Sequence, residues 1–199
     1  MEDSTKQETV IPRFAKLRLW IGPWIENFLY IGAAIILAAL IQAFVVRPFI
    51  VNGTSMDPNI KDRQYLIIDE VTYRARAIER GDVVVFRAPP DPTKYYVKRI
   101  IGLPGETVKI NGQKITIINT THPDGFILDE PYITHTSSDY LEIKVPADRY
   151  FVMGDNRSGS YDSREWGTLP KTSIRGRALL RLLPITAIDY LPGKEYYNE

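Results

Sequence analysis

The sequence predicts a mostly β domain that follows one apolar helix near the N-terminus. Residues 27–46 form an uncharged run, and short segments rich in β-branched residues recur after position 47. Gly and Pro separate these segments at short intervals, and no stretch after position 47 keeps a helical period. We therefore expect several small antiparallel sheets or a barrel-like arrangement.

The apolar run predicts a transmembrane helix over residues 28–46, preceded by a tail over residues 1–27. Gln42 is its one strongly polar residue. As a helix it would be about 28 Å long, close to the hydrocarbon thickness of a bilayer. A soluble helix of this length rarely lacks charge on every face, and no cleavage pattern of a signal peptide follows the run. Basic residues are balanced across the run and leave its orientation open.

Residues 47–199 are numerous enough for one further domain. The expected strands cover residues 64–68, 82–86, 95–101, 108–110, 114–117, 141–145 and 149–153. Asn111-Gly112 predicts a type I′ turn between the fourth and fifth of these. Residues 107–147 are more polar and predict a short β insertion in the core. Residues 70–80 fit either a short helix or an irregular loop.

Composition excludes several classes of function. The net charge is +1, which gives no electrostatic basis for binding nucleic acid. The chain has no cysteine, which excludes disulfides, thiolate nucleophiles and zinc held by cysteine. We expect neither a metal nor another cofactor.

Ser55 is a candidate nucleophile because it follows the apolar run by nine residues, in the string GTSMDP. A Ser-His-Asp triad would require His122 or His135 beside it. Both histidines lie in polar stretches typical of exposed loops. Ser55 would therefore need a different general base.

Lys98 is the candidate base, because it lies in an apolar strand where Tyr96 and Ile100 share its face. Burial would lower the pKa of the amine, and a neutral amine can accept the serine proton. Most strand lysines, however, point to solvent. The residues alone leave both arrangements open.

A third cluster follows the last expected strand, over residues 153–164. It is dense in Gly, Asn, Asp, Ser and Arg, which predicts a tight loop held by side-chain hydrogen bonds. The charges of Asp155, Arg157, Asp162 and Arg164 alternate in sign. This pattern fits an internal ion-pair scaffold as well as a surface turn.

Four strings in a fixed order after the apolar run resemble bacterial type I signal peptidases, of peptidase family S26. They are FIVNGTSMDPNI (49–60), RGDVVVF (80–86), YYVKRIIGLPGETV (95–108) and GDNRSGSYDSREWG (154–167). With one span and a short insertion, the chain is similar to the compact form of Gram-positive bacteria and cyanobacteria.

The resemblance implies that Ser55 is the nucleophile and Lys98 the general base. It also implies an oxyanion hole made by the backbone N–H of Ser55 and by a hydroxyl two residues earlier. Gly53 occupies that earlier position, so the second donor is missing from this chain.

The resemblance implies supporting roles for four residues of the 153–164 cluster. Ser160 would orient the amine of Lys98, Asp162 and Arg164 would form an ion pair, and Asp155 would steady the same loop. Five apolar residues would line the substrate pockets: Phe49, Val51, Met56, Ile60 and Val97. Ordinary core packing is the alternative for these five.

By this resemblance the expected activity is removal of signal peptides from exported preproteins, after small residues at positions −1 and −3. The expected partners are preproteins, the lipid bilayer and the secretion translocon. The expected place is the plasma or thylakoid membrane, with a cytoplasmic N-terminus and an extracytoplasmic catalytic domain. Two other hypotheses are a self-cleaving Ser-Lys repressor, which would need a DNA-binding module, and a non-catalytic, membrane-tethered peptide-binding β module.

Overall fold

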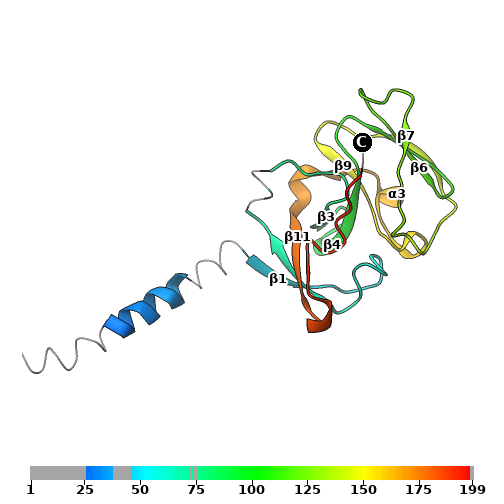
Figure 1. Ribbon diagram of the computed structural model, residues 1–199. Coiled ribbons are helices and arrows are strands. Elements are labelled where there is room, and N and C mark those ends of the chain that lie inside the picture. The colour runs from blue at the N-terminus through cyan, green and yellow to red at the C-terminus, as the bar shows by residue number, and fades with distance from the viewer. Residues whose placement is uncertain (1–25, 38–45, 72, 74–75, 198–199) are drawn as a thin grey trace, which may run out of the picture. The chain divides into compact units, whose positions relative to one another are not determined.

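The computed structural model describes residues 26–37, 46–71, 73 and 76–197 (Figure 1). The chain divides into two compact units, Met1–Ala43 and Phe44–Glu199. Residues 26–37 are helical and cover part of the predicted span. Residues 38–45 of that span, and residues 1–25 of the expected tail, lie outside the described residues. Within the described residues, no single helix combines the length and apolar character that crossing a membrane requires.

The second unit is mostly β, and every pairing between its named strands is antiparallel, which confirms the predicted fold class. The strands are β1 (Val46–Ile50), β2 (Tyr65–Asp69), β3 (Val83–Ala88), β4 (Asp91–Gly102), β5 (Thr107–Asn111), β6 (Lys114–Ile118), β7 (Phe126–Ile127), β8 (Tyr140–Lys144), β9 (Arg149–Met153), β10 (Leu169–Pro170), β11 (Ile174–Leu183) and β12 (Asp189–Tyr190). The short helices are η1 (Arg157–Gly159), α3 (Ser163–Trp166), η2 (Lys171–Ser173) and η3 (Ile185–Ala187).

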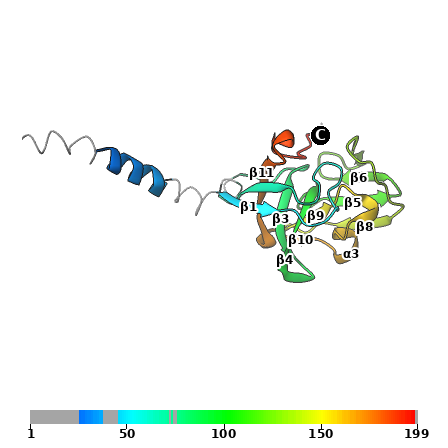
Figure 2. The same cartoon turned by 90° about the horizontal axis from the view of Figure 1, so that it is seen from below.

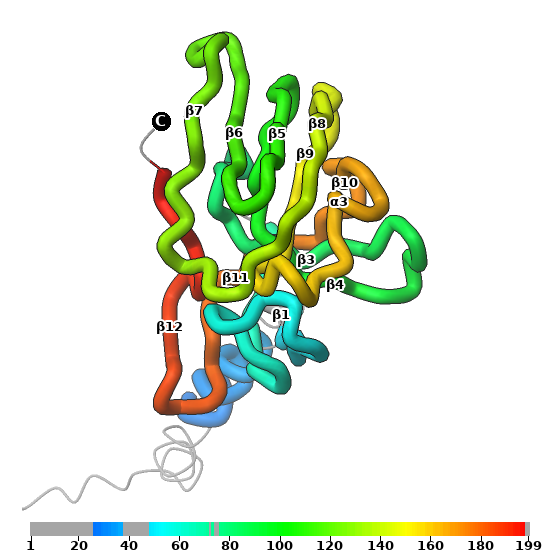
Figure 3. Tube along the Cα trace, turned by 90° about the vertical axis from the view of Figure 1, so that its right-hand side faces the viewer, coloured from blue at the N-terminus to red at the C-terminus, as the bar shows by residue number. Residues whose placement is uncertain are grey.

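The strands of this unit form two sheets. The larger has eight strands in the order β1-β2-β11-β3-β4-β9-β10, with β12 paired to β11. The smaller has four strands in the order β7-β6-β5-β8, and all of them lie within residues 107–144. Figures 2 and 3 show the smaller sheet at the end of the domain away from β1.

Most of the expected strands are present, with small shifts of their ends, and β9 has the predicted bounds. The two-residue strands β7, β10 and β12 and the longer strands β1 and β11 were not predicted. β1 contains Pro48, which lacks an N–H, but β1 is an edge strand and therefore tolerates it. β11 contains register shifts after Ala178 and Arg181, so its apolar residues do not alternate cleanly. In the stretch 70–80, residues 76–80 belong to neither a helix nor a strand.

The predicted type I′ turn at Asn111-Gly112 is wrong by one residue and in type. Asn111 pairs with Lys114, so the two loop residues are Gly112 and Gln113. Gly112 has a φ of 60°, and Gln113 is not among the residues with positive φ. One positive φ at the first loop position fits a type II′ turn, which needs glycine only there.

The strands β3 and β4 separate two apolar cores. Val83, Val85 and Val97 pack on one side, in a cluster that also contains Leu66 and Ile68 of β2. On the other side, Val84, Phe86 and Ile100 pack with residues of β9 and β10. A third cluster fills the space under the smaller sheet. β4 is therefore buried on both faces along its second half, and this is where Lys98 lies.

Candidate active site

Ser55 lies in the turn-rich segment between β1 and β2. The N–H of Asp57 donates to the carbonyl of Thr54 at 3.1 Å, and the N–H of Ile60 donates to that of Met56 at 2.9 Å. The side chains of Met56 and Ile60 are buried and fix the segment to the core beneath. Ser55 itself is half-buried, so its hydroxyl is held in place at the surface of a packed core.

Lys98 is 3% exposed, and its Nζ donates to Ser55 Oγ at 2.6 Å. The amine also lies 5.5 Å from the centre of the Tyr96 ring, on the face of β4 that the alternation predicts. Burial lowers the pKa of Lys98 to about 8, although the carboxylates of Asp162 and Asp155 act in the opposite direction. The alternative of a solvent-facing Lys98 is therefore wrong, because both cores enclose this part of β4.

The loop after β9 packs directly against the segment that carries Ser55. The N–H of Asn156 donates to the carbonyl of Ser55 at 3.1 Å, and its side-chain amide donates to the carbonyl of Thr54 at 3.2 Å. A Cβ on Gly154 would lie 2.2 Å from Ser160 Oγ and 2.4 Å from the Ser55 carbonyl oxygen. Glycine is required at this position because the two segments approach so closely.

Asp162 and Arg164 form the ion pair that the resemblance implies, at 2.8 Å. Asp162 is fully buried, accepts from the N–H of Gly154 at 3.0 Å, and caps α3 by accepting from the N–H of Arg164. Arg164 also contacts Asp139, at 2.6 Å, just before β8. The pair therefore connects the loop after β9 to the smaller sheet.

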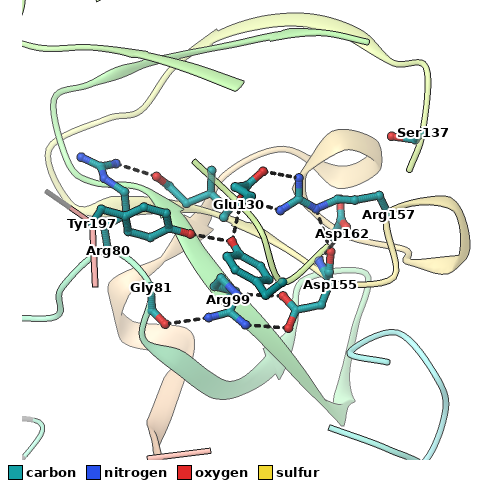
Figure 4. A network of polar contacts seen from close by, with 12 residues as sticks. Arg80, Gly81, Arg99, Glu130, Ser137, Asp155, Arg157, Asp162 and Tyr197 are labelled. Atoms are coloured by element: carbon teal, nitrogen blue, oxygen red, sulfur yellow. Dashed lines mark hydrogen bonds and ion pairs between the residues drawn. The ribbon is translucent and has the colours of Figure 1, made fainter. Parts of the chain in front are cut away.

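Asp155 has a partner that the sequence analysis missed. Arg99 is fully buried and donates to both carboxylate oxygens of Asp155, at 2.8 and 2.6 Å (Figure 4). Asp155 also accepts from the side-chain amide of Asn59 at 2.8 Å. The signal in the sequence was a second basic residue directly after Lys98 in an apolar strand, since successive side chains point to opposite faces.

Arg157 completes the scaffold of alternating charges. Its guanidinium donates to both carboxylate oxygens of Glu130, at 2.8 and 2.6 Å, and both side chains are buried. The predicted internal ion-pair scaffold is thus present, and the surface-turn alternative is wrong. Three of its four members pair with residues outside the cluster.

The hydrogen bond expected between Ser160 and Lys98 is not formed. Ser160 Oγ is buried and has no hydrogen-bond partner among the described residues. Its hydroxyl packs against Gly154, and the amine of Lys98 donates to Ser55 instead. Ser160 therefore fills space behind the nucleophile in this structure.

A pocket of about 70 Å³ opens beside Ser55 and Lys98. Four of the five predicted apolar residues line it: Phe49, Val51, Met56 and Val97. Ile60 does not line it, because its side chain is fully buried in the core below. The prediction missed further lining residues, namely Ile50, Asn52, Tyr95 and Tyr96. Three larger pockets among the described residues, of about 190, 210 and 690 Å³, are lined by neither Ser55 nor Lys98.

The histidines lie in other surroundings. His135 is exposed, with Nε2 at 3.4 Å from a carboxylate oxygen of Asp57. His122 is partly buried against the Phe126 ring at 5.0 Å, so its expected full exposure is wrong. Among the described residues, no three His, Asp or Glu side chains are grouped in a way that could hold a metal ion.

Comparison with known proteins places the chain in a family. The family model for signal peptidases, peptidase S26, matches residues 24–183. The probable signal peptidase I-2 of Synechocystis is 38% identical over 175 residues, which cover 84% of this chain and 77% of the relative. Signal peptidase I of Leptolyngbya laminosa is 36% identical and covers 85% of both chains. Signal peptidase I P of Bacillus subtilis subsp. natto is 37% identical, over 72% of this chain and 80% of the relative. The chain therefore belongs to the S26 family of signal peptidases.

Proposed function

We propose that this signal peptidase is a membrane-anchored serine endopeptidase in which Ser55 is the nucleophile and Lys98 the general base. The observation that carries the proposal is the 2.6 Å contact between Lys98 Nζ and Ser55 Oγ, made by an amine that is 3% exposed. Burial lowers the pKa of that amine to about 8, so a useful fraction is neutral near pH 7. A neutral amine at this distance can accept the hydroxyl proton.

The reaction follows from this geometry. Neutral Lys98 takes the proton of Ser55 as Oγ attacks the carbonyl carbon of the scissile peptide bond. The tetrahedral intermediate then collapses: the C–N bond breaks, and the lysine ammonium gives its proton to the departing amine. A water molecule, deprotonated by Lys98 in turn, attacks the acyl-enzyme ester and frees the serine.

The developing oxyanion requires hydrogen-bond donors. The resemblance assigns one donor, the backbone N–H of Ser55. Gly53 supplies no hydroxyl, and its own N–H donates to Asp62 at 2.8 Å. We propose that the enzyme works without a side-chain donor at this position.

Specificity is proposed to be steric. The pocket beside Ser55 holds about 70 Å³, and its apolar lining packs into the core. Small side chains at positions −1 and −3 of a preprotein enter such a pocket, whereas large ones clash with Phe49 and Met56. The preprotein backbone would add as a strand to an exposed edge beside it.

The membrane assignment is part of the proposal. Residues 28–46 are uncharged, and residues 28–37 of that run are helical, while its last residue, Val46, already belongs to β1. We propose that this run anchors the enzyme in the plasma or thylakoid membrane, with the N-terminus in the cytoplasm and the catalytic domain outside. Preproteins delivered by the secretion translocon would then meet Ser55 near the lipid surface.

The test is cleavage of a preprotein by the detergent-solubilised enzyme, with the new N-terminus identified by mass spectrometry. Ser55→Ala and Lys98→Ala should each lower kcat/KM by at least about 10³-fold. Ser138→Ala and Lys144→Ala are matched controls at exposed positions and should cleave like wild type. Equal cleavage by all five enzymes would refute the dyad. Tight binding of the preprotein without cleavage by wild type would favour the non-catalytic peptide-binding module.

A further inference from the structure

The C-terminal residues 191–197 contact residues 79–83 and the Arg99 side chain of β4, although they lie beyond the family match, which ends at residue 183. Figure 3 shows this segment leaving β12 and rising toward β7. Residues 195–197 line one pocket together with residues 126–129 and Pro131. The segment therefore joins the β11–β12 region of the larger sheet to the smaller sheet.

The backbone of this segment contacts Arg99 of β4 and Gly81, which lies just before β3. The carbonyl of Gly193 accepts a short hydrogen bond from Nη1 of Arg99, and the N–H of Glu195 donates to the carbonyl of Gly81 at 3.4 Å. A Cβ on Gly81 would lie 2.1 Å from the carbonyl oxygen of Glu195. The fit is so close that Gly81 leaves no room for a side chain.

Two side chains of the segment make polar contacts with the rest of the domain. Lys194 Nζ lies 2.7 Å from a carboxylate oxygen of Glu79 and 2.8 Å from one of Asp82, and its side chain is 4% exposed. The Tyr197 hydroxyl lies 2.5 Å from that of Tyr132 (Figure 4). Both contacts lie on the C-terminal side of Gly193, at the next residue and at the fourth residue after it.

Arg99 is contacted by the segment directly at Gly193 and indirectly through Tyr132. The Gly193 carbonyl binds the guanidinium directly, and the Tyr132 ring, which Tyr197 holds, lies 4.1 Å from its Cζ. Asp155 binds the same guanidinium in the plane of the fork. Arg99 is thus enclosed by the loop after β9 and by elements that the C-terminal segment fixes.

Arg99 connects this enclosure to the catalytic pair. It follows Lys98 in β4, so a shift of one side chain changes the backbone that carries the other. Through Asp155 it holds Asn59, which lies in the same segment as Ser55. The positions of both Lys98 and Ser55 therefore depend on the buried guanidinium of Arg99.

We propose that residues 191–197 form a C-terminal brace that positions Lys98 against Ser55 from behind β4, with Gly193, Lys194 and Tyr197 as positioning residues. The proposal rests on the assignment of Ser55 and Lys98 as the dyad. The brace touches no substrate; it acts by keeping Arg99 in one place. Its loss would lengthen the contact between the two reacting groups and admit water behind the lysine.

Both consequences have measurable signs. A displacement of about 1 Å in a reacting group can cost about 100-fold in rate. Water near Lys98 favours its charged form, so the acid limb of the pH profile would move to higher pH. A purely structural role would lower the melting temperature without moving that limb.

The experiment uses the full chain in detergent and compares five variants with wild type. One ends at Pro192, and two others are Lys194→Met and Tyr197→Phe. Lys194→Arg keeps the cation as the conservative replacement, and Tyr190→Phe is a matched control at an exposed tyrosine. Cleavage of a signal-peptide substrate is followed against pH, below the melting temperature of each variant.

The brace predicts a loss in kcat of about 10- to 100-fold for the truncated chain and a smaller loss for Lys194→Met and Tyr197→Phe, with KM little changed. The acid limb should move upward in each of the three. Lys194→Arg should recover most of the rate, and Tyr190→Phe should match wild type. If the truncated chain does not fold, the kinetics of Lys194→Met and Tyr197→Phe test the brace on their own. Unchanged kcat and an unmoved limb in Lys194→Met and Tyr197→Phe would overturn the brace, while wild-type cleavage abolished by Ser55→Ala would leave the dyad intact.

Discussion

Replacing Lys98 by methionine should abolish cleavage and stabilise the fold near neutral pH. Burial lowers the pKa of Lys98 from 10.5 to about 8, so the unfolded chain binds more protons between these two values. The free energy of unfolding therefore rises with pH between about 8 and 10.5. Below about pH 8 the folded state carries the full cost of burying the charged ammonium of Lys98. A difference of about two and a half pKa units corresponds to about 3 kcal/mol.

Lys98→Met removes that cost together with the hydrogen bond to Ser55, which contributes about 1 kcal/mol. The expected net gain is about 2 kcal/mol near pH 7. Near pH 11, where the lysine is largely neutral in both states, only the lost hydrogen bond remains, and the gain should become a loss of about 1 kcal/mol. Denaturant unfolding of the detergent-solubilised protein at the two pH values measures it, with Lys144→Met as the exposed control. A variant that is less stable than wild type near pH 7, or whose gain does not change with pH, would refute the reasoning.

Three further outcomes are expected. The kcat/KM of wild type should rise with pH through a midpoint of about 8, because the neutral amine is the active form, and a midpoint near 10.5 would contradict a buried base. Gly154→Ala should lower kcat by about 100-fold or more, since the added Cβ would meet the Ser55 carbonyl at 2.4 Å; unchanged kinetics would show that the loop can yield. Arg99→Met should destabilise the protein by about 3–5 kcal/mol in denaturant unfolding, because it leaves the Asp155 carboxylate buried and unpaired, and a loss below about 1 kcal/mol would count against that ion pair.

The fold class was predictable because most strands keep their local signature. β9 is a short apolar run between turns, buried at all but its first residue, and its bounds agree with the prediction. β1 and β11 escaped prediction for non-local reasons. Pro48 is acceptable because β1 has an open edge, and β11 pairs with two neighbours through register shifts that break the simple alternation of its residues. Neither condition can be recognised from a window of residues.

The candidate site was predictable as a set of residues, but its contacts were not. The sequence motifs identified Ser55 and Lys98, yet the burial of Lys98 depends on two cores built from distant segments. Contacts with distant segments also explain why the prediction for Ile60 was wrong: its apolar side chain would suit the substrate pocket, but it is fully buried in the core below that pocket. Ser160 differs because a hydroxyl's partner depends on a rotamer that no sequence pattern specifies.

The adjacent basic residues Lys98 and Arg99 of β4 have pKa values shifted in opposite directions, and this difference explains how one buried strand can hold both. Burial alone would lower the pKa of Arg99, but the two-pronged contact with Asp155 raises it above its ordinary value, so the guanidinium stays charged. Lys98 is as deeply buried, but its hydrogen bond goes to a neutral hydroxyl, and desolvation prevails. Exchanging the two residue types would fail on both counts, because arginine does not give up its proton and lysine lacks the planar fork that Asp155 binds. In the proposed mechanism the base therefore depends on its permanently charged neighbour, since the ion pair of Arg99 with Asp155 fixes the opposite side of the strand whose Lys98 amine contacts Ser55.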